Sequence, residues 1–108
     1  MFAGIIVMAV LLVTVVKPQS ASDGKTVFDA KCAMCHAKDG KGNPAVKGMA
    51  GGDLAKLNLV DEGTSKLTDG DLINTINNGK NKMPAYKGKL TDVQINSIVK
   101  YIRTLQGK

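Results

Sequence analysis

The sequence has no tryptophan and only two Phe and two Tyr residues. A chain of 108 residues forms one domain at most, and with so few aromatic side chains it buries little apolar area for its length. Small domains of this kind are usually stabilised by a disulfide, a metal or a cofactor. We therefore expect a large apolar cofactor to complete the interior.

No stretch of the chain alternates apolar and polar residues with period two, so no β-strand is predicted. Helical spacing is clearest near the carboxy terminus, where Ile95, Ile98 and Ile102 recur at steps of three and four. Thr91 and Gln94 have the spacing of a capping box at the start of this helix. The sequence therefore predicts an all-α domain.

Two further helices are predicted. One begins with Thr68 and Asp71 and ends at Gly79, a typical C-cap residue. The other is short and runs from residue 23 into Cys32. Residues 53–60 are predicted to form a short helix, and three stretches rich in Gly, Asn or Lys are predicted to be loops, at residues 37–52, 61–66 and 80–90.

The amino terminus holds a long apolar run, residues 2–16, which has no charge within it and no Lys or Arg before it. The run is long for the apolar part of a signal peptide and short of the ~20 residues that a comfortable membrane span needs. A cleaved export signal, an uncleaved membrane anchor and a buried core helix are the alternatives. We divide the chain into residues 1–22, a signal peptide or membrane anchor, and residues 23–108, the working domain. We expect an exported, periplasmic protein, either soluble after cleavage or anchored on the outer face of the inner membrane.

Chemistry is concentrated in the segment CAMCH, where Cys32, Cys35 and His36 are the only Cys and His residues of the chain. A structural zinc ion needs four such ligands, and a thioredoxin-like dithiol needs neighbouring strands. A disulfide would close only a very short loop and would leave His36 unexplained. Haem attachment explains all three residues, because the two thiols form thioethers with the haem vinyl groups and the histidine becomes the proximal iron ligand.

A six-coordinate haem needs a second axial ligand, and the chain has no other histidine. Methionine is the best remaining candidate, and a thioether ligand raises the reduction potential. Met49 and Met83 are the candidates, and Met83 is preferred; its place in a Lys- and Gly-rich loop rather than on an apolar helix face argues for a ligand and against a side chain that only fills the core. Pro84 directly after it and Tyr86 nearby would support the ligand.

These motifs together resemble those of the class I monohaem c-type cytochromes, especially the short soluble bacterial and algal forms. The resemblance covers residues 24–106. It rests on Gly24 and Phe28 near the start, on CAMCH, on NNGKNKMPAY around Met83 and on INSIVKYIRTL at the end.

The resemblance implies a fold of three to four helices around one covalently bound haem c, with the terminal helices crossing. It implies that Gly24 makes room for Tyr101 on the last helix, and that Phe28 lies at the same crossing. It also implies that the carbonyl of Pro44 accepts a hydrogen bond from the ring N–H of His36, which would orient the ligand.

With both axial positions filled, the iron cannot bind a substrate, so we expect a monomeric one-electron carrier with no enzymatic activity of its own. Two alternatives remain: a haem-based sensor or gas-binding module with a labile sixth ligand, and a haem subunit of a larger membrane oxidoreductase attached through residues 2–16. The chain has a net charge of +6, yet it shows no basic helix of the kind that binds nucleic acid. We expect the partners to be redox proteins whose acidic face meets four lysines around Met83, namely Lys80, Lys82, Lys87 and Lys89.

Overall fold

The computed structural model describes residues 4–11 and 20–108. Residues 4–11 are exposed and are not helical. No helix in these two ranges is long and apolar enough to cross a membrane. The remainder of the predicted signal or anchor, residues 1–3 and 12–19, lies outside the described residues.

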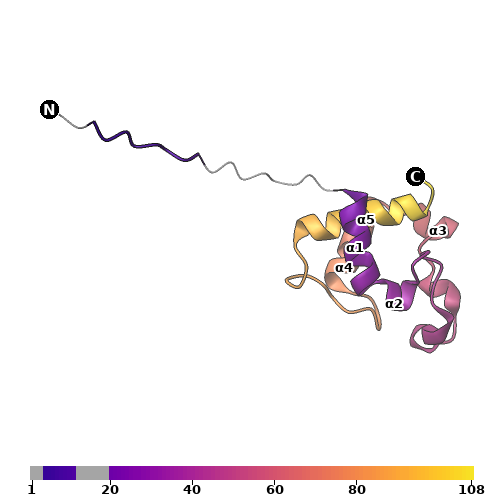
Figure 1. The fold of residues 1–108 in the computed structure, drawn as a ribbon. Helices are drawn as coiled ribbons and strands as arrows, with labels where there is room; N and C mark the ends of the chain where they lie inside the picture. Colours follow the sequence, from indigo (N-terminus) through magenta and orange to yellow (C-terminus); the bar gives the residue numbers. More distant parts are fainter. Residues whose placement is uncertain (1–3, 12–19) are drawn as a thin grey trace.

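The domain is all-α, as predicted, and no strand occurs among residues 20–108 (Figure 1). Only isolated bridges join Lys80 to Met83 and Lys87 to Leu90. The elements in chain order are α1 (Ala21–Lys31), α2 (Ala33–His36), the 3₁₀-helices η1 (Pro44–Ala50) and η2 (Leu54–Leu57), α3 (Glu62–Ser65), α4 (Asp69–Asn78) and α5 (Asp92–Leu105).

The predicted helix starts of α4 and α5 are confirmed. The hydroxyl of Thr68 accepts the N–H of Asp71, and the Asp71 carboxylate accepts the N–H of Thr68. Thr91 and Gln94 make the same pair of hydrogen bonds at the start of α5. Helix α4 ends at Gly79, whose φ of 73° suits glycine at this position.

The terminal helices cross, and α1 packs against α5 at the centre of the domain (Figure 1). Gly24 lies at the crossing, where a Cβ atom would come within 1.9 Å of the carbonyl oxygen of Ser97. The glycine therefore makes room for the backbone of α5 at Ser97 and Ile98. Tyr101 packs edge-on against Phe28, with the ring centroids 5.2 Å apart. The buried apolar residues come from α1, α4, α5 and Cys32.

The predicted loops contain more helical structure than the sequence suggested. Residues 44–50 form a 3₁₀-helix and residues 62–65 form one α-helical turn, so both loop predictions were wrong in part. The predicted helix at 53–60 is reduced to the four residues of η2. Each of these turns begins at a side chain that accepts a backbone N–H, namely that of Asn43, Asp53 or Asp61.

Candidate functional site

A cavity of about 450 Å³ is lined by residues of α1, α4 and α5, by the Cys–His motif, by η1 and η2, and by the loop that carries Met83. Cys32, Cys35, His36 and Met83, which the sequence singled out, all line it. The wall nearest the core is apolar and includes Phe28, Leu72, Ile76, Ile98 and Ile102.

The two cysteines lie where α1 ends and α2 begins. Cys32 lies between the two helices and caps the end of α1. Its carbonyl accepts the backbone N–H of His36, so the single turn of α2 keeps Cys32, Cys35 and His36 together. Cys32 is buried, Cys35 is half-buried, and no disulfide joins them. Burial, with a smaller effect of neighbouring Cys35, raises the pKa of the Cys32 thiol to about 11, so this thiol is protonated at neutral pH.

The His36 ring is oriented by a backbone carbonyl. Its Nδ1 lies 2.8 Å from the carbonyl oxygen of Leu57. A carbonyl only accepts hydrogen bonds, so Nδ1 carries the proton and Nε2 keeps its lone pair. Burial lowers the pKa of His36, although the bond to Leu57 opposes this effect. The imidazole is therefore neutral at physiological pH, which is the form that binds metals.

The acceptor assigned to Pro44 is thus corrected to Leu57. Pro44 is exposed at the start of η1 and does not line the cavity, so its carbonyl does not fill this role. Leu57 ends η2, a turn that the side chain of Asp53 begins. Any residue has a backbone carbonyl, so no sequence signal could have identified Leu57.

Met83 lies half-buried in a tight turn, where its N–H donates to the carbonyl of Lys80 and its own carbonyl accepts the Lys80 N–H. Gly79 makes this turn possible, since a Cβ atom there would lie 2.5 Å from the Met83 carbonyl oxygen. Met49, the alternative thioether, also lines the cavity but is 48% exposed on η1.

The two residues expected to support Met83 lie beside it in the cavity wall. Pro84 and Tyr86 both line the cavity. The Tyr86 hydroxyl donates to the carbonyl of Lys31 at 3.1 Å, and its N–H donates to the carbonyl of Ile76. Tyr86 therefore ties the methionine loop to the end of α1 and to α4.

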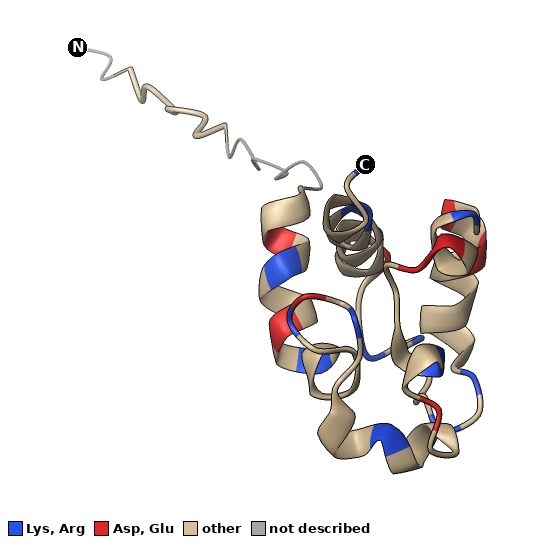
Figure 2. Cartoon of the chain, turned by 90° about the vertical axis from the view of Figure 1, so that its right-hand side faces the viewer, with Lys and Arg blue, Asp and Glu red and all other residues tan. Residues whose placement is uncertain are grey.

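The four predicted lysines divide into two pairs. Lys80 and Lys82 line the cavity, whereas Lys87 and Lys89 are exposed but do not line it. Lys31 and Lys56 also line the cavity and were missed, because they lie far from Met83 in sequence. Figure 2 shows Lys and Arg distributed over helices and loops, with acidic residues between them, and not collected along one helix.

The donor set fits a haem. Two thiols, a neutral imidazole with a free Nε2 and a thioether line one cavity whose inner wall is apolar, as a large apolar cofactor requires. Within residues 4–11 and 20–108, no three His, Cys, Asp or Glu side chains gather in a way that could hold a bare metal ion.

Comparison with known proteins agrees with this chemistry. Residues 19–102 match the family described as cytochrome c oxidase, cbb3-type, subunit III. The chain is 39% identical over 82 residues to cytochrome c6 of Leptolyngbya boryana, a match that covers 76% of this chain and 88% of that protein. It is 36% identical over 89 residues to the cbb3-type cytochrome c oxidase subunit CcoP of Azospirillum brasilense, covering 82% of this chain but only 29% of that subunit.

Solved structures show the same fold. The c-type cytochrome KustC0563 superposes with a TM-score of 0.65 at 27% identity, covering 77% of this chain and 96% of that one. Cytochrome c6 from the diatom Phaeodactylum tricornutum superposes with a TM-score of 0.59 at 26% identity, covering 82% and 95%.

Fold, motif and comparisons define a small haem protein of the c type. The chain belongs to the cytochrome c family. As in this family generally, it carries one covalently bound haem c and transfers electrons. The chain spans most of the length of the cytochromes c6 and less than a third of the oxidase subunits that it matches.

Proposed function

We propose that this chain is a mobile one-electron carrier whose haem is attached through Cys32 and Cys35 and ligated by His36 and Met83. The observation that carries the proposal is that these four side chains line one cavity, with His36 held in the tautomer that leaves Nε2 unprotonated. His36 and Met83 would take the two ligand positions of the iron that the haem leaves open, so no position would remain for a substrate and we expect no enzymatic activity of the domain itself.

The haem supplies one-electron exchange when bound, and each part of the chain has a separate task. The thiols hold the cofactor covalently, and Leu57 orients His36 and makes it a stronger donor. The apolar wall from α1, α4 and α5 excludes water, which disfavours the extra charge of ferric iron. Pro84 and Tyr86 hold the Met83 turn in position.

Replacing each methionine tests the ligand assignment. Met83→Leu should abolish the weak long-wavelength absorption band of the Fe–S(Met) bond, lower the reduction potential and let carbon monoxide bind the reduced protein. Met49→Leu is the matched control and should leave all three properties unchanged. If Met49→Leu removes the band, Met49 is the ligand. If the wild-type protein has no such band and binds carbon monoxide, the domain is a gas-binding module instead.

The partners of the carrier are redox proteins with an acidic docking face. Of these four lysines, Lys80 and Lys82 line the cavity, whereas Lys87 and Lys89 do not. The double variant Lys80→Glu with Lys82→Glu should slow reduction by an acidic partner at low salt more than Lys87→Glu with Lys89→Glu, which changes charge equally. Equal rates for wild type and both variants would contradict docking on this surface.

A second candidate is a haem subunit of a membrane oxidase, because the matched family is described by such a subunit. In this case the apolar residues 2–16 remain as an anchor, whereas the free carrier is exported and loses them. The mass of the protein isolated from its host separates the two, together with its fractionation. An intact amino terminus and co-purification with oxidase subunits would favour the second candidate.

A further inference from the structure

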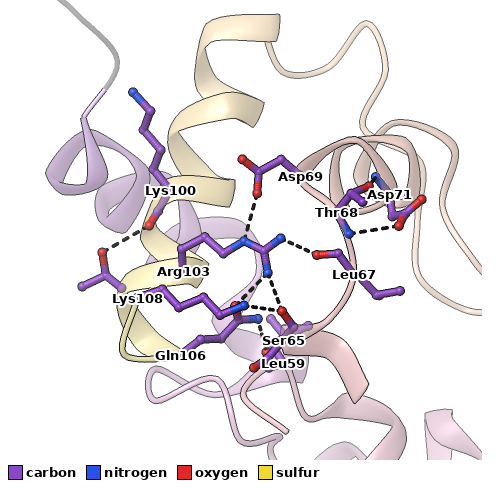
Figure 3. Close-up of polar contacts among 11 residues, drawn as sticks. Leu59, Ser65, Leu67, Thr68, Asp69, Asp71, Lys100, Arg103, Gln106 and Lys108 are labelled. Atoms are coloured by element: carbon purple, nitrogen blue, oxygen red, sulfur yellow. Dashed lines mark hydrogen bonds and ion pairs between the residues drawn. The ribbon is translucent and has the colours of Figure 1, made fainter. Parts of the chain in front are cut away.

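The single arginine of the chain lies far from the Cys–His motif in sequence, at the end of α5. The Arg103 side chain is only 17% exposed and makes an ion pair with Asp69 at 2.9 Å. Its remaining N–H groups donate to the carbonyls of Ser65 and Leu67 and to the side chain of Gln106 (Figure 3). One guanidinium therefore holds the chain between α3 and α4 at three points.

Gln106 extends this contact toward the cavity. Its side-chain amide donates to the carbonyl of Leu59 at 2.7 Å, and its carbonyl oxygen accepts from Arg103 at 2.9 Å (Figure 3). Lys108 donates to the carbonyl of Ser65. Since Leu59 also donates its N–H to the carbonyl of Gly40, this network connects α5 to the chain on both sides of η1 and η2.

The segment held in this way forms part of the cavity wall. Leu59, Thr64 and Leu67 line the cavity, and Leu57, which accepts the His36 hydrogen bond, lies two residues before Leu59. No apolar side chain between residues 57 and 67 is fully buried, so packing alone holds this segment weakly. The polar contacts from α5, together with the bond from Leu59 to Gly40, are therefore expected to fix its position.

We propose that Arg103 and Gln106 are positioning residues that hold the Leu57 carbonyl against His36 and so set the reduction potential of the haem. This rests on the proposed function only in that His36 is an iron ligand. A hydrogen bond from Nδ1 makes the imidazole a stronger donor, which favours ferric iron. If the carbonyl moves away, the donor weakens and the potential rises.

The sign of the change in reduction potential distinguishes an effect of positioning from an effect of charge. Loss of a cation near the haem favours the more positive ferric state, so the potential falls. Loss of the Leu57 hydrogen bond raises it. Arg103→Lys keeps the charge but loses the planar fork that reaches several acceptors, so its effect comes from positioning alone. Gln106→Ala changes no charge and removes the contact with Leu59.

The experiment uses the haem-loaded protein and two readouts, the midpoint potential and the solvent exchange of the His36 Nδ1 proton in the reduced state by NMR. Arg103→Lys and Gln106→Ala should each raise the potential and speed exchange about tenfold, because the carbonyl leaves the ring more often. Lys66→Gln is the control, since it removes a charge and an exposed ion pair with Glu62 from the same segment. It should leave exchange unchanged.

Unchanged exchange and potential in both Arg103→Lys and Gln106→Ala would overturn the proposal, even if denaturant unfolding showed both variants to be less stable. A lower potential in Arg103→Gln with wild-type behaviour in Arg103→Lys would assign the effect to charge and also overturn it. Should the wild-type spectrum show no histidine bound to iron, the proposed function fails instead. The two failures are therefore distinguishable.

Discussion

Two regions of this domain are built on different principles. The helical core consists of α1, α4 and α5, and its apolar side chains are buried against one another. The cavity segment, residues 37–67, carries η1, η2 and α3, and its only fully buried residues are Gly40 and Gly42. One region is stabilised by packing, and the other is shaped mainly by polar caps and backbone conformation.

The difference assigns separate tasks to the two regions. The helical core can exclude water because most of the side chains that it turns to the cavity are apolar, with Lys31 and Thr75 as the exceptions. The cavity segment provides the carbonyl that orients His36, which needs correct backbone placement more than apolar area. We therefore expect changes in the core to affect the whole domain, and changes in the cavity segment to act locally.

The largest effect is expected at the helix crossing. In Gly24→Ala the new Cβ would lie 1.9 Å from the Ser97 carbonyl oxygen, and a backbone atom cannot rotate away. The helices must separate, so we expect a loss of about 3 kcal/mol or more in the free energy of unfolding. Denaturant unfolding of the haem-loaded protein measures it.

The control for this variant is Gly63→Ala. Gly63 lies in α3, where a Cβ atom would meet no other atom within 4 Å, and its φ is not positive. This substitution should be neutral or slightly stabilising. If both alanine variants unfold at the same denaturant concentration, close approach at the crossing is not what stabilises the domain.

The helical core could be predicted from the sequence because its signals are local. Thr68 with Asp71 and Thr91 with Gln94 are capping boxes, and the structure confirms both. Apolar spacing then identified the buried side of α5. In the cavity segment the short helix at 53–60 was predicted, but η1 and α3 were missed because Asn43 and Asp61 start them through local side-chain hydrogen bonds that leave no clear helical period in the sequence.

In the candidate site, too, the residues with a local sequence signal could be predicted and the others could not. Cys32, Cys35 and His36 are recognised by residue type and spacing, and the structure brings Met83 to the same cavity. Leu57 acts through its backbone, so its identity carries no signal. Contacts such as Arg103 with Leu67 join residues distant in sequence, and a single sequence does not reveal them.

An intermediate and local effect is expected in the cavity segment. Gly40 has a φ of 76°, and a Cβ atom there would lie 3.1 Å from Leu105 and 3.2 Å from Val60. Gly40→Ala should cost about 1–2 kcal/mol in backbone strain, with some added crowding. Hydrogen exchange should rise mainly within residues 37–67 and less in α5.

Gly51→Ala separates strain from crowding. Gly51 has a similar φ of 68° but no atom within 4 Å of a Cβ position. Gly51→Ala should therefore show the effect of backbone strain alone, with a smaller loss of stability than Gly40→Ala. Faster exchange throughout α1 and α5 in Gly40→Ala would show that the two regions unfold as one unit and would remove the distinction between them.

The smallest effect is expected within the helical core, where the two capping boxes should differ in their dependence on pH. Hydrogen bonds from Thr68 lower the pKa of the Asp71 carboxyl, so this box stabilises the fold above the ordinary carboxyl pKa and loses its effect as pH falls through the lowered value. Gln94 makes the equivalent contact in α5 and does not titrate. Asp71→Gln should therefore weaken the acid dependence of unfolding measured between neutral and acidic pH. An unchanged pH profile would mean that protonation of Asp71 does not alter the stability of the fold, so that the carboxylate cap of α4 acts no differently from the amide cap of α5.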